Sequence, residues 1–184
     1  MLTDDLKEQT KTNHQLLEKK LVAKMRAMCS KQDYSELLAV FFSYFGGLEQ
    51  LIQSNLILAK VPDYELRRKA SALAADIEVL GGRLPALATP DSLPLITDHF
   101  EALGALYVIE GSTLGGQIIT GMINKQLEIS EGLSFFEGYG EETVSMWQKF
   151  QSVLNQPENL PGSAVIKAAN ETFLKFSSWF DVNA

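Results

Sequence analysis

Apolar residues recur along this chain every three to four positions, and no stretch shows the strict alternation that is typical of a strand. Near the N-terminus, one apolar face covers an arc of about 100° on a helical wheel and consists of Leu6, Thr10, Leu17, Leu21, Met25 and Met28. Thr3 has a side chain that caps helices, and Asp4 and Asp5 supply the acidic first turn that favours a helix start. The pattern predicts a helix from Thr3 to about Met28.

Glycines, prolines and capping residues divide the rest of the chain into further helical segments. Asp33, with Glu36 three residues later, has the form of a capping box and predicts the start of a second helix. In chain order, the further predicted helices cover residues 34–59, 62–82, 95–126, 141–154 and 162–181. The connections between them are a proline-rich stretch over residues 85–94, a loop over residues 132–140 and the helix-breaking segment 156–162. The expected fold class is all-α, a compact array of six to eight helices.

Length and charge narrow the class of protein. The chain of 184 residues and 20.4 kDa suffices for one domain with a sizeable core, so we expect residues 1–184 to form a single domain. A formal charge of -7 and a pI near 4.9 disfavour a general nucleic-acid-binding role. Cys29 is the only cysteine, which excludes an intrachain disulfide, and no stretch is long and apolar enough to span a membrane. We therefore expect a soluble, cytoplasmic protein.

A stripe of four polar side chains borders the apolar face of the first helix. Spacings of four, three and four residues bring Lys7, Lys11, His14 and Glu18 to one side of that helix. In one interpretation, His14 is a core-edge histidine that a neighbour satisfies, and the lysines are solvated. In the other, His14 binds a metal through one ring nitrogen, and Glu18 accepts a hydrogen bond from the other nitrogen. The lysines then face anionic groups, which favours a metallocofactor with carboxylates over a zinc or di-iron site, because no HExxH or ExxH pair is present.

Glycines are concentrated in the long helix predicted over residues 95–126, although each costs a helix interior about 1 kcal/mol relative to alanine. Three of them share one face within about 40° on the wheel: Gly104, Gly111 and Gly115. This bare strip allows the close approach of either another helix or something flat. The doublet Gly115-Gly116 predicts a local bend, and Ser112 supplies a hydroxyl beside the strip. His99 points away from the glycines on the same wheel, so we expect it to be structural or exposed.

Two segments together resemble the heme oxygenase family. Residues 6–14, Leu-Lys-Glu-Gln-Thr-Lys-Thr-Asn-His, followed by Glu18, resemble the proximal helix of that family. Residues 105–117, which contain Gly-Ser-Thr-Leu-Gly-Gly, resemble its kinked distal helix in the form seen in a subset of soluble bacterial members. Weaker similarities lie in residues 65–70, in residues 132–136 and in the last helix with Phe173 and Phe180. The resemblance extends over nearly the whole chain and implies a heme oxygenase-like multihelical bundle.

The resemblance implies roles for residues on both sides of a bound heme. His14 corresponds to the proximal ligand of the heme iron, and Glu18 to its hydrogen-bond partner. On the distal side, Gly111 and Gly115 correspond to the positions where bare backbone lies over the porphyrin. Ser112 stands where many members of the family carry an aspartate that holds a water network near bound O2. Gly111, Ser112 and Gly115 are therefore the expected catalytic segment.

The resemblance also implies basic partners for the heme propionates. Lys7 and Lys11 correspond to positions near these carboxylates. The family's further basic partners, on the helix before the last, correspond here to Trp147 and Gln151, with only Lys149 close by. In full, the cofactor contacts that we expect are Lys7, Lys11, His14, Glu18, Gly111, Gly115, Lys149 and Phe173.

The function that the resemblance implies is the oxidative opening of heme, which serves as both cofactor and substrate, to biliverdin, CO and ferrous iron. O2 is the co-substrate, and a neutral imidazole ligand suits this chemistry because it pushes less electron density onto the iron than a thiolate does. Electrons must come from a ferredoxin or reductase, because the chain has no flavin, nicotinamide or iron–sulfur motif. Two alternatives stay open: a heme carrier or sensor without turnover, and a relative that binds a different small molecule.

Overall fold

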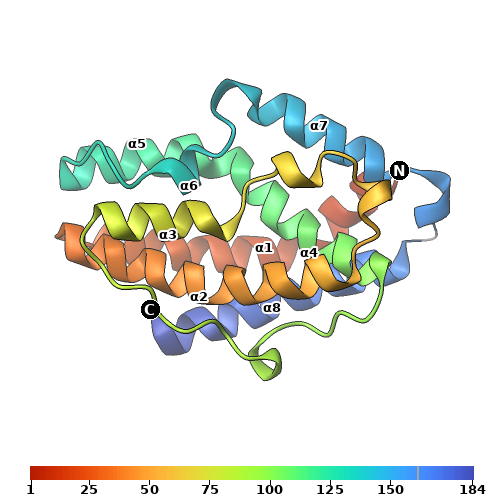
Figure 1. Ribbon diagram of the computed structural model, residues 1–184, viewed down its shortest axis with the longest axis horizontal. Coiled ribbons are helices and arrows are strands. Elements are labelled where there is room, and N and C mark those ends of the chain that lie inside the picture. The colour runs from red at the N-terminus through yellow and green to blue at the C-terminus, as the bar shows by residue number, and fades with distance from the viewer. Residues whose placement is uncertain (161) are drawn as a thin grey trace.

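The computed structural model describes residues 1–160 and 162–184, and every regular element in them is helical (Figure 1). The α-helices are α1 (Leu2–Ala27), α2 (Lys31–Asn55), α3 (Ala70–Val79), α4 (His99–Gly111), α5 (Gly116–Leu127), α6 (Ser134–Glu137), α7 (Thr143–Leu154) and α8 (Ser163–Asn183). The 3₁₀ helices are η1 (Leu58–Lys60), η2 (Tyr64–Leu66), η3 (Pro90–Ser92), η4 (Ser112–Gly115), η5 (Gly140–Glu142) and η6 (Pro157–Asn159). The all-α prediction is confirmed. Pro161, in the predicted helix-breaking segment, lies outside the described residues.

The first helix follows the predicted pattern but begins differently. Its apolar face is buried as expected, with Leu21 half-buried at its edge. Thr3, however, is not the N-cap, because Met1 holds that position and Thr3 lies inside α1. The Thr3 backbone N–H and hydroxyl donate instead to Oδ1 of Asn155, at 3.2 and 3.3 Å. Thr3, whose sequence neighbours suggest an N-cap, thus joins α1 to the end of α7.

The second and third helices each begin at a different residue from the one predicted. The N-cap of α2 is Ser30, whose side chain accepts from the Asp33 N–H while Asp33 reaches back, so Asp33 is the third residue of the capping box and not the cap. The third helix begins at Ala70 and not at Pro62. Before it, the chain forms η2 and then passes through Arg67 in extended conformation, with φ −79° and ψ 149°. The segment that was expected to be the first half of a helix is therefore an arginine-bearing connection.

The long glycine-rich helix is divided in two, as the Gly115-Gly116 doublet predicts. Asp98 caps α4 through the Glu101 N–H, and the helix runs to Gly111. A turn of 3₁₀ helix, η4, then separates α4 from α5. The start at residue 95 was four residues early because the capping aspartate lies further along the chain.

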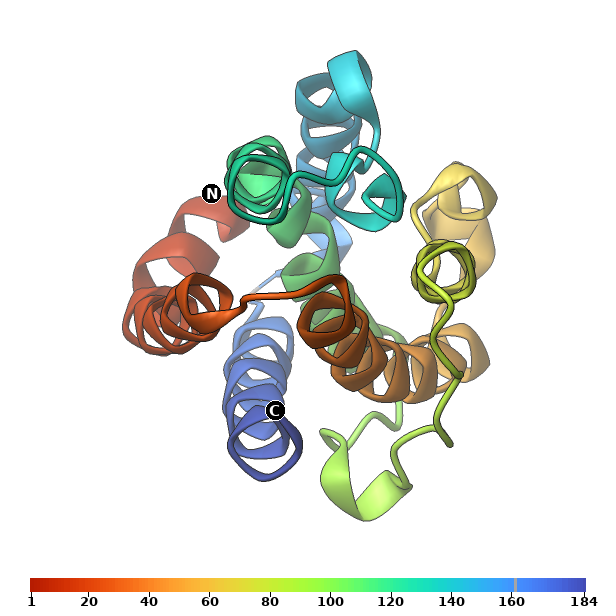
Figure 2. The ribbon, with the colours of Figure 1, turned by 90° about the vertical axis from the view of Figure 1, so that its left-hand side faces the viewer.

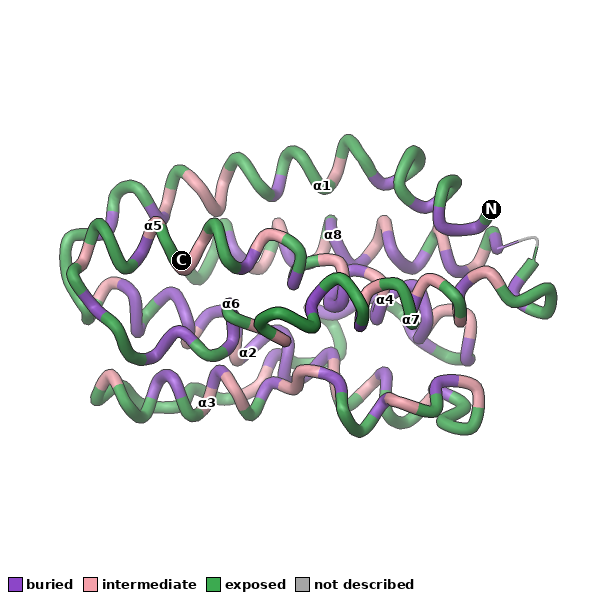
Figure 3. Tube along the Cα trace, turned by 90° about the horizontal axis from the view of Figure 1, so that it is seen from above, coloured by how far each residue is buried: buried purple, intermediate pink, exposed green. Residues whose placement is uncertain are grey.

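Helix α4 lies at the centre of the bundle, where it packs against α8, α2 and α7 (Figure 2). Buried and exposed positions alternate along the outer helices such as α1 and α8, whereas α4 has no exposed residue (Figure 3). An aromatic cluster joins α2 to α8, in which Phe176 contacts Phe41, Tyr44 and Phe45 with ring centroids 4.8 to 5.1 Å apart. This core fixes α4 and α8, and α1 packs against α8 beside them. Within the described residues, no helix is long and apolar enough to cross a membrane.

Candidate functional site

Helices α1 and α4–α5 run in the same direction and are joined at two levels (Figure 1). At the first level, Tyr107 of α4 lies close to Thr10 of α1; burial raises the pKa of Tyr107, and the polar Thr10 side chain opposes the rise. At the second level, the side-chain amide of Gln126 in α5 donates to the carbonyl oxygens of Met25, Arg26 and Met28 at the end of α1. One turn beyond the first level, α1 carries His14 and α4 carries Gly111. The predicted proximal and distal residues therefore lie between the same two joints.

On α1, the predicted stripe lies at the surface. Lys7, Lys11, His14 and Glu18 are all exposed, and they form no ion pair with the described residues. The imidazole of His14 contacts the ring of Phe173 on α8, with centroids 5.6 Å apart and planes inclined by 59°. The hydrogen bond that the sequence suggests between His14 and Glu18 is not formed here. The four residues share one side of α1, and their roles stay predictions.

The glycines of α4 and α5 divide into two kinds by what a side chain would meet. At Gly104 an added Cβ would lie 2.2 Å from the Val165 carbonyl oxygen, and at Gly116 it would lie 1.8 Å from that of Phe136. At Gly111 it would meet only the Trp147 ring, at 3.7 Å, and at Gly115 nothing within 4 Å. The helix-packing interpretation therefore holds for Gly104 and not for Gly111 or Gly115, whose role at a flat ligand stays a prediction.

Backbone conformation does not explain the two open glycines. Gly111 has φ −60° and ψ −30°, and Gly115 has φ −89° and ψ −8°, which any L-residue adopts. Both are half-buried although a methyl group would fit at either, against the Trp147 ring at Gly111 and in open space at Gly115, whereas Gly121, which also meets no atom, is simply exposed. Since neither packing nor φ requires glycine there, the free space itself is the remaining physical reason for two residues that weaken a helix.

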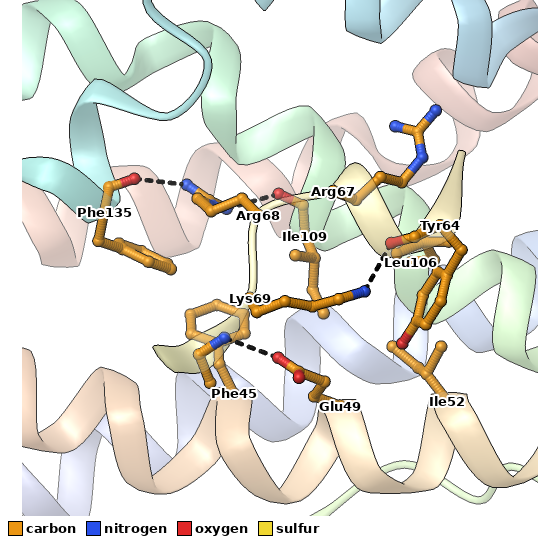
Figure 4. Close-up of a pocket in the computed structure, with 11 residues that line it drawn as sticks. Phe45, Glu49, Ile52, Tyr64, Arg67, Arg68, Lys69, Leu106, Ile109 and Phe135 are labelled. Carbon is orange, nitrogen blue, oxygen red and sulfur yellow. Dashed lines mark hydrogen bonds between the residues drawn. The ribbon is translucent and has the colours of Figure 1, made fainter. Parts of the chain in front are cut away.

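Ser112 lies at the break between the open glycines, and its hydroxyl is held by two protein groups. Its Oγ donates to the Ile109 carbonyl oxygen at 2.6 Å and accepts from Nη2 of Arg68 at 2.7 Å. Arg68 also donates to the carbonyl oxygens of Ile109 and Phe135, at 2.9 and 3.0 Å (Figure 4). Its guanidinium stacks 3.9 Å above the Phe135 ring.

Behind the break lies a buried charged network that the sequence did not predict. Glu110, with 1% of its surface exposed, accepts from Nη1 of Arg67, which also makes two hydrogen bonds to Asp63. The Tyr139 hydroxyl donates to Glu110, and burial together with the charge of Glu110 raises the pKa of Tyr139 to about 12. The sequence signal for this network is Glu110, a charged residue inside the apolar run before Gly111. A buried carboxylate requires hydrogen-bond donors as partners, so its position implies such donors nearby.

The remaining predicted residues lie in different surroundings. Trp147 on α7 contacts Tyr107, with ring centroids 5.7 Å apart, and borders Gly111. Lys149 is exposed and lies about 200° around α7 from Trp147, so the structure does not bring it to the glycines. His99 is buried, and its Nδ1 accepts from the Ile57 N–H at 3.2 Å, which confirms the structural interpretation of this histidine.

Two hollows accompany these residues. An open one of about 560 Å³ follows α1 and is lined by Gln15, Glu18, Lys19, Val22, Ala23 and Arg26. Its volume falls in the range of small-molecule sites, which is roughly 300–1,000 Å³. The other, of about 10 Å³, is enclosed beside Lys69 and Phe45 and has room for no more than a water molecule (Figure 4). Neither hollow is lined by His14, Gly111 or Gly115, so neither by itself marks the predicted site.

Comparisons with known proteins agree with this fold. Residues 1–182 match the family model described as heme oxygenase. A heme oxygenase of Xanthomonas campestris pv. campestris (strain 8004) is 32% identical over 124 residues, which cover 67% of this chain and 72% of that protein. The structure of heme oxygenase from Leptospira interrogans aligns with a TM-score of 0.77 at 22% identity, over 98% of both chains. Heme oxygenase-1 from the cyanobacterium Synechocystis sp. PCC6803, in complex with heme, aligns with a TM-score of 0.74 at 17% identity, over 98% of this chain and 91% of that chain.

Proposed function

Because the chain belongs to the heme oxygenase family, we propose that it is a heme-degrading monooxygenase that converts heme to biliverdin, CO and ferrous iron. O2 is the co-substrate in this proposal. Electrons come from an external ferredoxin or reductase, because the sequence has no flavin, nicotinamide or iron–sulfur motif. A cytoplasmic location belongs to the same proposal, as does a single domain over residues 1–184.

One observation carries the proposal: two half-buried glycines with ordinary helical φ leave room for a side chain that the sequence does not supply, one turn beyond the level of Thr10 and Tyr107, where α1 carries an imidazole without a hydrogen-bond partner among the described residues. Gly111 and Gly115 form the bare side, and His14 stands one turn beyond the joint between Thr10 and Tyr107. A flat ring with a metal at its centre fits these residues, because it needs a nitrogen ligand on one face and close backbone on the other. When bound, heme supplies both the iron that activates O2 and the ring that is opened.

On the proximal side, His14 holds the iron through one ring nitrogen, and contact with Phe173 limits the rotation of the imidazole. Glu18 lies one turn further along α1, in reach of the second ring nitrogen once the imidazole is fixed by a ligand. A carboxylate in that position fixes the tautomer and raises the basicity of the histidine. Lys7 and Lys11 lie toward the N-terminus on the same side, where their charges favour the heme carboxylates.

On the distal side, Gly111 and Gly115 exclude side chains from the space above the ring. The backbone of η4 can then approach the ligand closely, and Trp147 borders the space at the α7 end. Ser112 is the exposed hydroxyl-bearing residue of this turn, because Thr113 is buried and donates to the Glu110 carbonyl oxygen. A close, rigid wall of this kind excludes bulk water and limits which edge of the ring faces the reacting oxygen.

Turnover under controlled conditions tests the proposed function. The purified protein is titrated with ferric heme, and the 1:1 complex is then given electrons and O2 in the presence of catalase, which removes the free peroxide that can imitate turnover. We expect biliverdin and ferrous iron. A stable oxygenated heme without biliverdin would reject the enzyme hypothesis and favour a heme carrier or sensor. Absence of 1:1 heme binding would favour the hypothesis of a relative that binds a different small molecule.

The ligand assignment is tested with a matched pair of histidine variants. We expect His14→Ala to lose the absorption spectrum of an imidazole-bound ferric heme and added imidazole to restore it. His99→Ala is the control, because His99 is buried at the start of α4 and accepts from Ile57. An unchanged spectrum in His14→Ala would contradict the assignment.

A further inference from the structure

Arg68 is a half-buried cation that binds the break in the distal helix. It lies in the extended connection between η2 and α3, distant in sequence from everything it binds. Its guanidinium donates to the Phe135 carbonyl from one nitrogen and to the Ile109 carbonyl from another (Figure 4). The second nitrogen also donates to Ser112 Oγ. Its own backbone N–H donates to the Tyr139 hydroxyl at 2.8 Å. One side chain thereby joins α6, the end of α4 and the first residue of η4.

These bonds decide what the Ser112 hydroxyl can still do. A serine hydroxyl has one proton to donate and two lone pairs to accept with. The proton goes to the Ile109 carbonyl oxygen, and one lone pair takes the bond from Arg68. What remains is a single lone pair on an exposed residue. Ser112 can accept a hydrogen bond from the solvent side, but it cannot donate one without breaking a bond to the protein.

The geometry of η4 shows where that lone pair lies. Residues i and i+3 of a 3₁₀ helix eclipse one another, so Ser112 projects on the same side as Gly115. At Gly115 nothing of the protein lies within 4 Å of the Cβ position, so this is the open side. The hydroxyl therefore borders the space that the glycines leave free.

From these contacts, and resting on the proposed function, we propose that Arg68 is a positioning residue that holds Ser112 as a hydrogen-bond acceptor toward the distal side of bound heme. Burial lowers the pKa of Arg68 to about 10, and the charge of Glu110 opposes this. The group is thus still a cation at neutral pH and keeps donating. The other titratable groups at the break are Glu110 of α4, Tyr139 and Arg67.

A pH titration of the ferric heme complex tests the acceptor. An acceptor favours the protonated form of an ionising partner on the distal side, so its loss lowers the pH midpoint of the absorption change. We expect Ser112→Ala and Arg68→Met each to lower the midpoint by about 0.5 to 1 pH unit. The double variant should shift no further than the larger single variant, because both act through one hydroxyl.

Lys69→Met is the matched control, because this neighbouring cation donates to the Tyr64 carbonyl and does not contact the break. We expect its midpoint to equal that of the wild type. An unchanged or raised midpoint in Ser112→Ala, or an equal shift in Lys69→Met, would overturn the inference. If Arg68→Met does not fold, Ser112→Ala still tests whether Ser112 acts as the acceptor. Arg68→Lys then tests whether Arg68 positions Ser112, since lysine keeps the charge and cannot bridge the same three acceptors.

Hydrogen exchange of the heme-free protein separates this inference from the proposed function. Amides of residues 109–116 should exchange faster in Arg68→Met than in Lys69→Met, because the Ile109 carbonyl and η4 lose their anchor. Failure of the wild type to bind heme would reject the proposed function alone. Equal exchange in the two variants would reject the positioning role, whether or not heme binds.

Discussion

Gly104 and Gly116 lie against neighbouring backbone, whereas Gly111 and Gly115, between them in the chain, lie beside free space. All four occur in one helical region, and none has positive φ. The first pair lets α4 approach α8 and lets α5 approach α6. The second pair brings no element of this chain closer. Glycines that look alike in sequence thus serve two purposes, and only the structure separates them.

The difference also divides the distal region into a filled part and an open part. In the filled part, hydrogen bonds and ion pairs satisfy polar groups such as Glu110 within the protein. In the open part, the Ser112 hydroxyl keeps an unused lone pair, and Gly115 leaves free space beside it. Substitutions in the filled part should therefore change the free energy of unfolding, and substitutions in the open part should change ligand behaviour.

The largest expected effect is the loss of stability in Gly116→Ala. The new methyl group would lie 1.8 Å from the Phe136 carbonyl oxygen, and backbone cannot yield as a flexible side chain does. We expect the free energy of unfolding to fall by about 2–3 kcal/mol, as for an overpacked core, measured by denaturant titration of the heme-free protein. Gly104→Ala should act in the same direction. Unchanged stability in both would remove the distinction between the two pairs.

A smaller effect of opposite sign is expected for Gly111→Ala and Gly115→Ala. Both positions have helical backbone and room for a methyl group, so the free energy of unfolding should rise by about 0.5–1 kcal/mol. Biliverdin formation should nevertheless slow, or shift to another isomer, because the methyl group occupies the space above the ring. Denaturant titration and single-turnover product analysis measure the two effects. Normal turnover in both variants would show that the free space does not serve heme.

The smallest effect is expected on the opposite wall, from reversing both charges in Lys7→Glu with Lys11→Glu. Exposed ion pairs contribute about 0–1 kcal/mol, so heme affinity should fall by no more than a few fold. The biliverdin isomer ratio should respond as well, because the carboxylates set the rotation of the ring. Lys149→Glu is the control, since Lys149 lies away from the glycines. If affinity and isomer ratio both stay constant, the two lysines have no role at the ligand.

Much of the fold could be predicted from local pattern, because helical periodicity and breakers act over a few residues. The division of the distal helix followed from Gly115-Gly116, and the buried face of α1 followed from its spacing. The third helix was predicted to start eight residues too early. Its first part is extended because Arg67 and Arg68 bind groups that are distant in sequence, and no local signal records such partners.

The residues of the candidate site could be predicted from the sequence, but the residues that hold them in place could not. His14, Gly111 and Gly115 were found from spacing together with resemblance to a family. Arg68 was noticed only as part of a weak similarity, because its function depends on carbonyl groups, which every residue has. The separation of Gly104 from the open glycines depended on the position of α8, which the periodicity of one helix does not contain.

The two joints that hold α1 to α4–α5 connect the folding of this protein to its ligand. Between Thr10 and Gln126, α1 packs against α8 but has few contacts with α4–α5, so a ligand that enters there adds contacts that the unfolded chain cannot make. Binding to the folded state alone raises the free energy of unfolding, by about 2.7 kcal/mol at a hundredfold excess over Kd. Susceptibility to proteases then falls as the ligand becomes plentiful. The half-life of the protein in a cell would thus follow the supply of its own substrate.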